Sequence, residues 1–175
     1  MNRRSAGLVL LVGGLVLLQA CGFGLRGSVR QSGSELVGQL YIEGEGSILR
    51  PLRNALSAQQ VQFAVFRKDA DTLVNVNNEI LSSRVASVSS DGRVSEFELL
   101  HSIDLLTVRS EDGVKAGELA PESLGKPAQT VSVIRDYTYD ETAVLAKDDE
   151  EQILRAEMSD ELVRHLVLRI FAGSR

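Results

Sequence analysis

Two long runs of alternating apolar and polar residues, joined by an Asp-Gly turn, constrain the fold of this chain most. The second run is the more regular: Phe97, Leu99, Ile103 and Leu105 fall on one side, and Glu96, Glu98, Ser102 and Asp104 on the other. Alternation with a period of two is typical of a strand with one buried face. Asp91-Gly92 between such runs indicates a hairpin turn. A long hairpin is therefore predicted, with a first strand that reaches Val88 and twists near Ser82-Ser83.

Shorter patterns on either side of the hairpin predict three more strands. Residues 36–42 predict a first strand, and residues 61–66 predict a short edge strand. The alternation of Val131, Val133, Tyr137 and Tyr139 predicts the last strand, with Arg135 on the same face. Residues 110–129 contain several glycines and prolines and predict a long loop before that last strand.

Two stretches with helical spacing complete the pattern. Ser47 is predicted to cap a helix that runs to about Gln60, with Pro51 in its first turn, where a missing N–H costs little. A final helix is predicted to follow a connector over residues 140–147 and to open with the acidic run 148–151, which suits the positive end of the helix dipole. Its core stripe is predicted to be Leu154, Met158, Leu162, Leu166 and Ile170, with Ile153, Val163 and Val167 beside it.

This order of elements predicts an α+β fold. Runs of strands flanked by two amphipathic helices favour a two-layer sandwich, with both helices packed on a mostly antiparallel or mixed sheet of about four to five strands. The residues offer little chemistry for catalysis. His101 falls on the apolar side of its strand, with no second His or Cys nearby in sequence. A core or partner-facing histidine is favoured over a metal ligand, and neither a metal nor an enzymatic activity is expected.

The N-terminus has the pattern of a lipoprotein signal peptide. Arg3-Arg4 precede an uncharged run over residues 7–18, and Leu18-Gln19-Ala20 lead directly into Cys21. Such a run of 12 residues would rise about 18 Å as a helix, which is too short for a hydrocarbon core of about 30 Å. We therefore expect cleavage before Cys21, followed by attachment of a diacylglyceryl group to its sulfur and an acyl chain to its amine, a set of chains long enough to anchor a domain.

The predicted organisation is a cleaved signal over residues 1–20, a lipidated tether over 21–35 and one α+β domain over 36–175. Removal of residues 1–20 takes away two arginines and no acid, so 17 basic and 24 acidic residues remain, a net charge of −7. A surface this acidic argues against nucleic acid as a general partner. The glycines over residues 22–27 match the spacing of a dinucleotide-binding loop, but that loop needs a strand before it and a helix after it, so no cofactor is expected.

Two motifs resemble one known family. The run Cys-Gly-Phe-Gly-Leu-Arg-Gly over residues 21–27, placed directly after a lipoprotein signal, resembles the opening of the LPS-assembly lipoproteins of the LptE family. The run Val-Leu-Ala-Lys-Asp-Asp-Glu-Glu-Gln over residues 144–152 resembles the family's entry into its last helix. The order of elements agrees as well. The resemblance implies an outer-membrane lipoprotein that sits in the lumen of the β-barrel LptD, assists assembly of that barrel and binds lipopolysaccharide.

The resemblance also implies specific contacts with lipopolysaccharide. Lys147 matches a family lysine implicated in binding, although in this sequence it can also pair with Asp149 or Glu151. The family's second basic residue lies at the hairpin tip, where this chain has Ser90. Arg93 is the nearest substitute and Arg84 a weaker one. Two alternatives remain on sequence alone: a generic periplasm-facing lipoprotein that is structural or binds a small ligand, and a hydrolase whose residues assemble only in space.

Overall fold

The computed structural model describes residues 37–110, 114–118, 128–140 and 144–172. The predicted signal peptide and tether, including Cys21, lie outside these residues. No helix in the described part is both long enough and apolar enough to cross a membrane.

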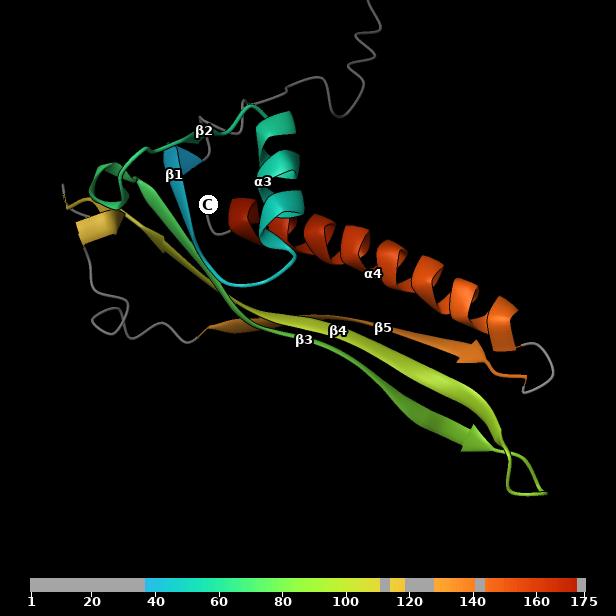
Figure 1. Ribbon diagram of the computed structural model, residues 1–175. Helices are drawn as coiled ribbons and strands as arrows, with labels where there is room; N and C mark the ends of the chain where they lie inside the picture. The colour runs from blue at the N-terminus through green and yellow to red at the C-terminus, as the bar shows by residue number, and fades with distance from the viewer. Residues whose placement is uncertain (1–36, 111–113, 119–127, 141–143, 173–175) are drawn as a thin grey trace, which may run out of the picture. The chain divides into compact units, whose positions relative to one another are not determined.

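Five strands form one mixed sheet (Figure 1). The strands are β1 (Gln39–Gly44), β2 (Gln62–Phe63), β3 (Thr72–Val88), β4 (Val94–Arg109) and β5 (Gln129–Thr138). They lie in the order β2-β1-β3-β4-β5. β1 is parallel to both β2 and β3, whereas β3, β4 and β5 pair antiparallel. The α+β class, the mixed sheet and the short edge strand are thus confirmed.

Both helices lie on the same face of this sheet (Figure 1). Helix α3 spans Leu49–Ala58 and contacts β1 and α4, while α4 spans Val144–Ala172 and packs on β5 and β4. The predicted stripe of α4 is confirmed: Met158, Leu162, Leu166 and Ile170 are fully buried, and Leu154 packs against the same core. Ile153 was predicted to lie beside the stripe, and this is wrong because its side chain points outward and is 60% exposed.

A β-bulge changes the orientation of β3 halfway along. The register with β4 shifts between Asn77 and Ile80, and Asn78 has a φ of 54°, a conformation that Asn tolerates better than most residues. Before the bulge, Val74 and Val76 face the helices; after it, the odd-numbered residues up to Val85 do, since Leu81 pairs with His101 and Val85 with Phe97. The register is regular at Ser82-Ser83, where the sequence predicted a twist, and the irregularity of this half of the strand lies earlier, between Asn77 and Ile80.

The bulge directs Glu79 toward the start of α3. Its carboxylate accepts hydrogen bonds from the Ser47 backbone N–H at 2.6 Å, the Ser47 hydroxyl at 2.7 Å and the Ile48 N–H at 3.4 Å. The prediction that Ser47 caps this helix is wrong. Ile48 is the N-cap and provides no side-chain cap, so a carboxylate from the sheet binds these N–H groups instead. His101, buried as predicted, places Nε2 at 2.9 Å from Glu79 Oε1.

The last helix begins earlier than predicted. α4 starts at Val144, so Lys147 lies in its first turn and not in a connector. The acidic run 148–151 consequently belongs to the helix interior and does not cap its N-terminus. The motif predicted a helix correctly but the wrong starting residue, since a pattern of charges does not define which residue first adopts helical geometry.

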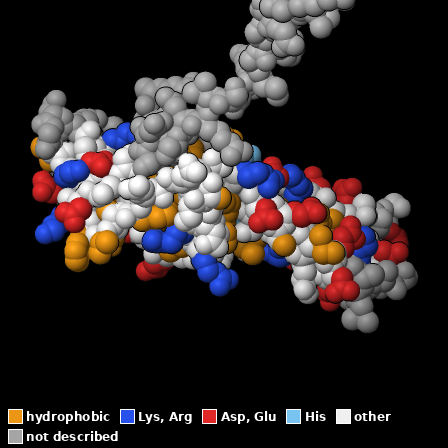
Figure 2. All heavy atoms as spheres, turned by 90° about the horizontal axis from the view of Figure 1, so that it is seen from above, with side chains coloured by type: hydrophobic (Ala, Val, Ile, Leu, Met, Phe, Trp, Pro, Cys, Tyr) orange, Lys and Arg blue, Asp and Glu red, His pale blue; other side chains and the backbone are white. Residues whose placement is uncertain are grey.

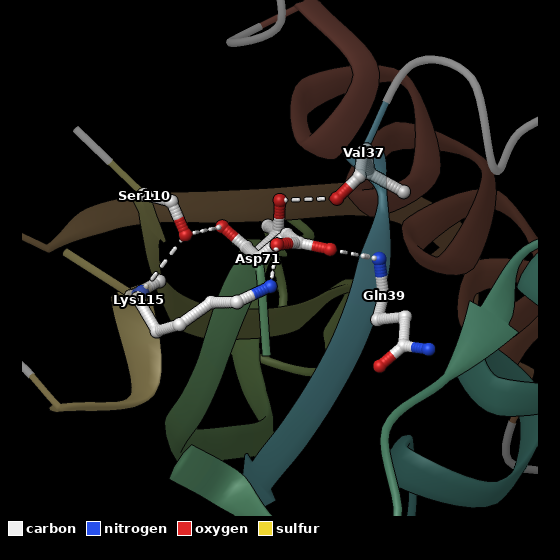
Figure 3. Close-up of polar contacts among 7 residues, drawn as sticks. Val37, Gln39, Asp71, Ser110 and Lys115 are labelled. Atoms are coloured by element: carbon white, nitrogen blue, oxygen red, sulfur yellow. Dashed lines mark hydrogen bonds and ion pairs between the residues drawn. The ribbon is translucent and has the colours of Figure 1, made fainter. Parts of the chain in front are cut away.

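At the opposite end of the sheet, Asp71 connects several segments (Figure 3). Its carboxylate accepts a hydrogen bond from the Gln39 N–H at 2.9 Å and forms an ion pair with Lys115. Its backbone carbonyl accepts a hydrogen bond from the Ser110 N–H at 2.8 Å. Lys115 adjoins a short 3-10 helix, η3 (Ala116–Glu118), and Ala116 is buried against Leu73 on the sheet face away from the helices. The long loop predicted over residues 110–129 thus contains this short 3-10 helix, and its last residue, Gln129, already belongs to β5.

Candidate functional site

The hairpin turn places Arg93 at the tip of the β3–β4 pair. Gly92 adopts a φ of 82°, which the turn requires and which glycine adopts without strain. Ser89 N–H donates to the Arg93 carbonyl at 2.8 Å, closing the turn as the Asp-Gly signal predicts. Arg93 Nε lies 3.4 Å from Asp91 Oδ2, and both side chains are largely exposed. Arg93 is thus a solvated base at the end of the hairpin.

Arg84 lies on β3 before the hairpin turn, on the sheet face away from the helices. Its guanidinium forms a bidentate pair with Glu98 on β4, with Nε to Oε1 at 2.6 Å and Nη2 to Oε2 at 2.9 Å. This pair lowers the pKa of Glu98 and raises the pKa of Arg84. Arg84 is therefore already neutralised by a specific carboxylate, which makes it less available to an anion than an unpaired base would be.

Lys147 is the most enclosed of the three predicted bases. Its ammonium donates to Glu150 Oε2 at 2.7 Å, one helical turn along α4, and its side chain is 18% exposed. The sequence suggested Asp149 or Glu151 as pairing residues, whereas the structure shows Glu150. Glu151 instead accepts the Tyr137 hydroxyl at 2.7 Å and Arg155 Nε at 2.7 Å.

The pairing of α4 with β5 fixes the surroundings of Lys147. The hydrogen bond from Tyr137 lowers the pKa of Glu151, and burial together with that bond raises the pKa of the Tyr137 hydroxyl. Tyr137 stacks on Phe97 with ring centroids 5.7 Å apart, and Tyr139 meets Phe97 edge-on at 5.2 Å. These three rings hold the ends of β4 and β5 beneath the start of α4.

The structure brings Lys147 and Arg93 to the same end of the sheet. Phe97 pairs with Tyr137, and Tyr139 N–H donates to the Ser95 carbonyl at 2.8 Å, so the strand leading to α4 runs beside the hairpin close to its tip. Figure 1 shows the start of α4 and the hairpin tip at one end. Arg84 lies nearer the middle of the sheet, opposite Glu98, and does not join them.

Acidic side chains surround these bases. Figure 2 shows that Asp and Glu side chains gather toward the end where α4 begins, with only scattered basic ones among them. The electrostatic potential of these acids does not attract an anionic ligand. Such a ligand would therefore have to be bound by a few specific bases that release their carboxylate partners. Among the described residues, no group of three or more His, Cys, Asp or Glu side chains forms a potential metal site.

Sequence patterns gave no indication of the Glu79 and Asp71 networks. Glu79 follows an alternation that would place it on the outer face, and only the pair Asn77-Asn78 hints at a bulge that reverses its direction. Asp71 sits in a charged turn that resembles any solvated connector. Both networks join residues more than thirty positions apart in the chain, which a local pattern does not reveal.

Comparisons with known proteins agree on one family. The family model described as "LptE: Lipopolysaccharide-assembly" matches residues 38–170. Proteins named "LPS-assembly lipoprotein LptE" from Yersinia pestis (strain Pestoides F) and Yersinia pseudotuberculosis serotype O:1b (strain IP 31758) are each 32% identical over 170 residues, covering 93% of this chain and 74% of theirs.

Solved structures share the fold. An uncharacterized lipoprotein B from Nitrosomonas europaea aligns with a TM-score of 0.67 at 23% identity, covering 87% of this chain and 92% of that one. The rare lipoprotein B from Shewanella oneidensis aligns with a TM-score of 0.60 at 22% identity, covering 77% of this chain and 94% of that one. At these identities the likeness concerns the fold alone.

Proposed function

The chain belongs to the LptE family of lipopolysaccharide-assembly lipoproteins, and we propose that it binds lipopolysaccharide and acts with the β-barrel LptD to assemble it at the cell surface. The observation that carries this proposal is the family match across residues 38–170, which includes the whole described sheet, helix α3 and helix α4 up to Ile170. No catalytic role is assigned. The protein acts by binding and by shape.

The binding site proposed for lipopolysaccharide lies at the hairpin-tip end of the sheet. Lys147 and Arg93 are its primary bases, and Arg84 is an auxiliary one. Lipid A carries phosphates, which a compact ammonium and a planar guanidinium both bind well. Lys147 is paired with Glu150, and Arg93 lies beside Asp91. A phosphate must therefore displace each carboxylate from its base or bind the base together with that carboxylate. Binding is therefore expected to be local and to weaken as salt increases.

A double charge reversal tests this site. Lys147→Asp with Arg93→Asp removes both primary bases, and each lost charge-assisted hydrogen bond is worth about 1.5–3 kcal/mol. Affinity for purified lipopolysaccharide should fall about tenfold or more. Thermal stability should change little, because an ion pair spaced i,i+3 along a helix contributes only about 0.2–0.5 kcal/mol.

The matched control is Arg50→Asp with Arg164→Asp. Both residues are exposed on the helices, and the control changes the net charge by the same amount. Its affinity for lipopolysaccharide should stay close to that of the wild type. Equal weakening in both double variants would indicate a general charge effect, and unchanged affinity in the folded Lys147/Arg93 variant would reject the site.

We further propose that the protein is held on the periplasmic side of the outer membrane by acyl chains on Cys21. Gly22, and not Asp, follows the cysteine, and in enteric-type sorting this favours the outer membrane. Cys21→Ala should abolish incorporation of labelled palmitate and leave an uncleaved or mislocalised precursor. Recovery of the mature wild-type protein in inner-membrane fractions would contradict this location.

The proposed partner is LptD, with this chain acting as a plug that also assists barrel assembly. A small domain built on a hydrogen-bonded sheet with a fully buried core suits a rigid plug. The alternative, a generic periplasm-facing lipoprotein that is structural or binds a small ligand, predicts no stoichiometric barrel complex. Recovery of such a complex from native membranes therefore separates the two functions.

A further inference from the structure

Half of β3 has an unpaired outer edge. β1 covers that edge only from Thr72 to Val76, where it ends at Gly44. β3 continues to Val88, still paired with β4 on its other side. No strand in the described part of the chain lies against the outer side of Ile80–Val88, which we name the free edge. Its nine residues extend about 30 Å.

Apolar side chains on the free edge are exposed on both faces of the sheet. The exposed fractions are 50% for Ile80, 48% for Leu81, 47% for Val85 and 60% for Val88. Leu81 and Val85 lie on the helix side, since they pair with His101 and Phe97, whereas Ile80 pairs with Ser102 on the other side. α4 packs on β4 and β5, and α3 starts beside Glu79, so neither helix covers the free edge on its side.

The free edge carries few of the features that prevent strands from pairing with other chains. Edge strands are usually protected by prolines, lysines, inward-pointing charges or shortness. The sequence from Ile80 to Val88 contains no proline, and Arg84 is its only charged residue. The guanidinium of Arg84 is paired with Glu98 on the neighbouring strand β4, so it points away from the free edge and does not block pairing there. The bulge at Asn78 precedes the free edge. Two further register shifts, between Val85 and Ser87 and between Ser87 and Val88, interrupt its far end, so the regular part open to pairing runs from Ile80 to Val85.

We propose that the free edge binds an extended segment of the barrel partner by strand addition. This proposal rests on the proposed function and specifies which part of the chain makes the contact. Main-chain N–H and C=O groups of Ile80–Val85 would pair with the added strand. Apolar side chains at alternate positions of that strand would pack beside Leu81 and Val85. The added segment must lie outside the barrel wall, because the strands of a closed barrel are already paired on both edges.

Charge favours such a partner over a second copy of this chain. An antiparallel pairing of two free edges about a two-fold axis, centred on the middle of the nine residues, would place Arg84 beside its own counterpart. Although Glu98 pairs with each Arg84, the two guanidiniums would still lie next to each other on one face, and like charges directly opposite one another destabilise a strand pair. The free edge also contains no acid, although the mature chain has a net charge of −7. A neutral or acidic apolar strand therefore fits it better than a basic one.

Paired lysine substitutions test the proposal in the full-length lipidated chain, purified from detergent-solubilised native outer membranes. Leu81→Lys with Val85→Lys leaves two solvated lysines in the free protein but places both charges directly beside the apolar side chains of an added strand. The amount of barrel protein recovered per chain should fall at least tenfold. The control, Ile153→Lys with Leu168→Lys on α4, alters side chains that are 60% and 66% exposed and should recover the barrel as the wild type does. Thermal unfolding checks that both variants fold.

Photo-crosslinking identifies the occupant. A photoreactive residue replaces Ser83 or Ala86 on the free edge, or Asp160 on the exposed side of α4 as a reference. Adducts from the free edge that map to a segment of the barrel protein would support strand addition. Adducts to a second copy, or no adduct from either edge position, would overturn it. Wild-type-like barrel recovery by the folded Leu81/Val85 variant would also overturn it while preserving the proposed function, whereas absence of a barrel from the wild-type preparation would reject both.

Discussion

Replacement of Glu79 by Ala should destabilise the domain by about 2–4 kcal/mol. The carboxylate binds the N–H groups at the start of α3, and loss of a helix cap costs about 0.5–2 kcal/mol. It is also the hydrogen-bond partner of His101 Nε2, on a ring whose side chain is only 3% exposed. Among the residues that the structure describes, none is a hydrogen-bond partner of His101 Nδ1, so the variant would leave the whole buried ring unpaired, at a further cost of about 1–3 kcal/mol.

Urea unfolding followed by far-UV circular dichroism measures this loss. The midpoint should shift with an unchanged slope, and the melting temperature should fall by about 5–15 °C for a chain of this size. Glu79→Gln retains an oxygen that can accept the helix N–H groups and should lose about half as much. Glu45→Ala, an exposed acid in the same loop, is the control. If Glu79→Ala cost less than about 0.5 kcal/mol, the hydrogen bonds from the Glu79 carboxylate to the start of α3 would make no measurable contribution to stability.

Three further outcomes follow from the same structure. Leu162→Ala should cost about 2–5 kcal/mol because its side chain is fully buried, while Ile153→Ala on the same helix should stay within about 0.5 kcal/mol in urea unfolding; a loss under about 0.5 kcal/mol for Leu162→Ala would contradict the two-layer core. Gly117→Ala should lower the melting temperature, since an added Cβ would lie 1.5 Å from the Arg67 carbonyl oxygen, and an unchanged melting temperature would show that the η3 contact is dispensable. Burial raises the pKa of Glu79, but the hydrogen bonds that the carboxylate accepts outweigh burial and lower the pKa from 4.5, so the stability that the ionised carboxylate gives is present above pH 4.5 and is lost as the pH falls below it. The stability of Glu79→Gln should therefore fall less steeply with acid than that of the wild type. An identical pH profile for the two proteins would refute this.

Regular periodicity made the main elements predictable. The alternation through Phe97 and Leu99 and the stripe through Met158 and Leu162 each report a buried face, and the structure buries those faces. The Asp-Gly turn determined where the two long strands reverse. These features depend on residues close in sequence, which is why the α+β class and the packing of α4 followed from sequence.

Contacts between distant residues were not predictable in the same way. A bulge at Asn78 reverses which side chains face the helices, and alternation alone would place Glu79 on the wrong face. The start of α4 at Val144 depends on how the chain leaves β5, and the acidic run after Lys147 suggested a later start. For the candidate site, the sequence supplied Lys147 and Arg93, but only the pairing of Tyr139 with Ser95 shows that both lie at one end.

Purification of the lipidated wild-type protein from detergent-solubilised native outer membranes tests the central proposal most directly. The protein is expected to elute as a one-to-one complex with a large β-barrel protein identifiable as LptD, with lipopolysaccharide bound. A protein that elutes as a lone monomer after gentle extraction, with the lipid anchor intact and the domain folded, would contradict the role as a barrel plug.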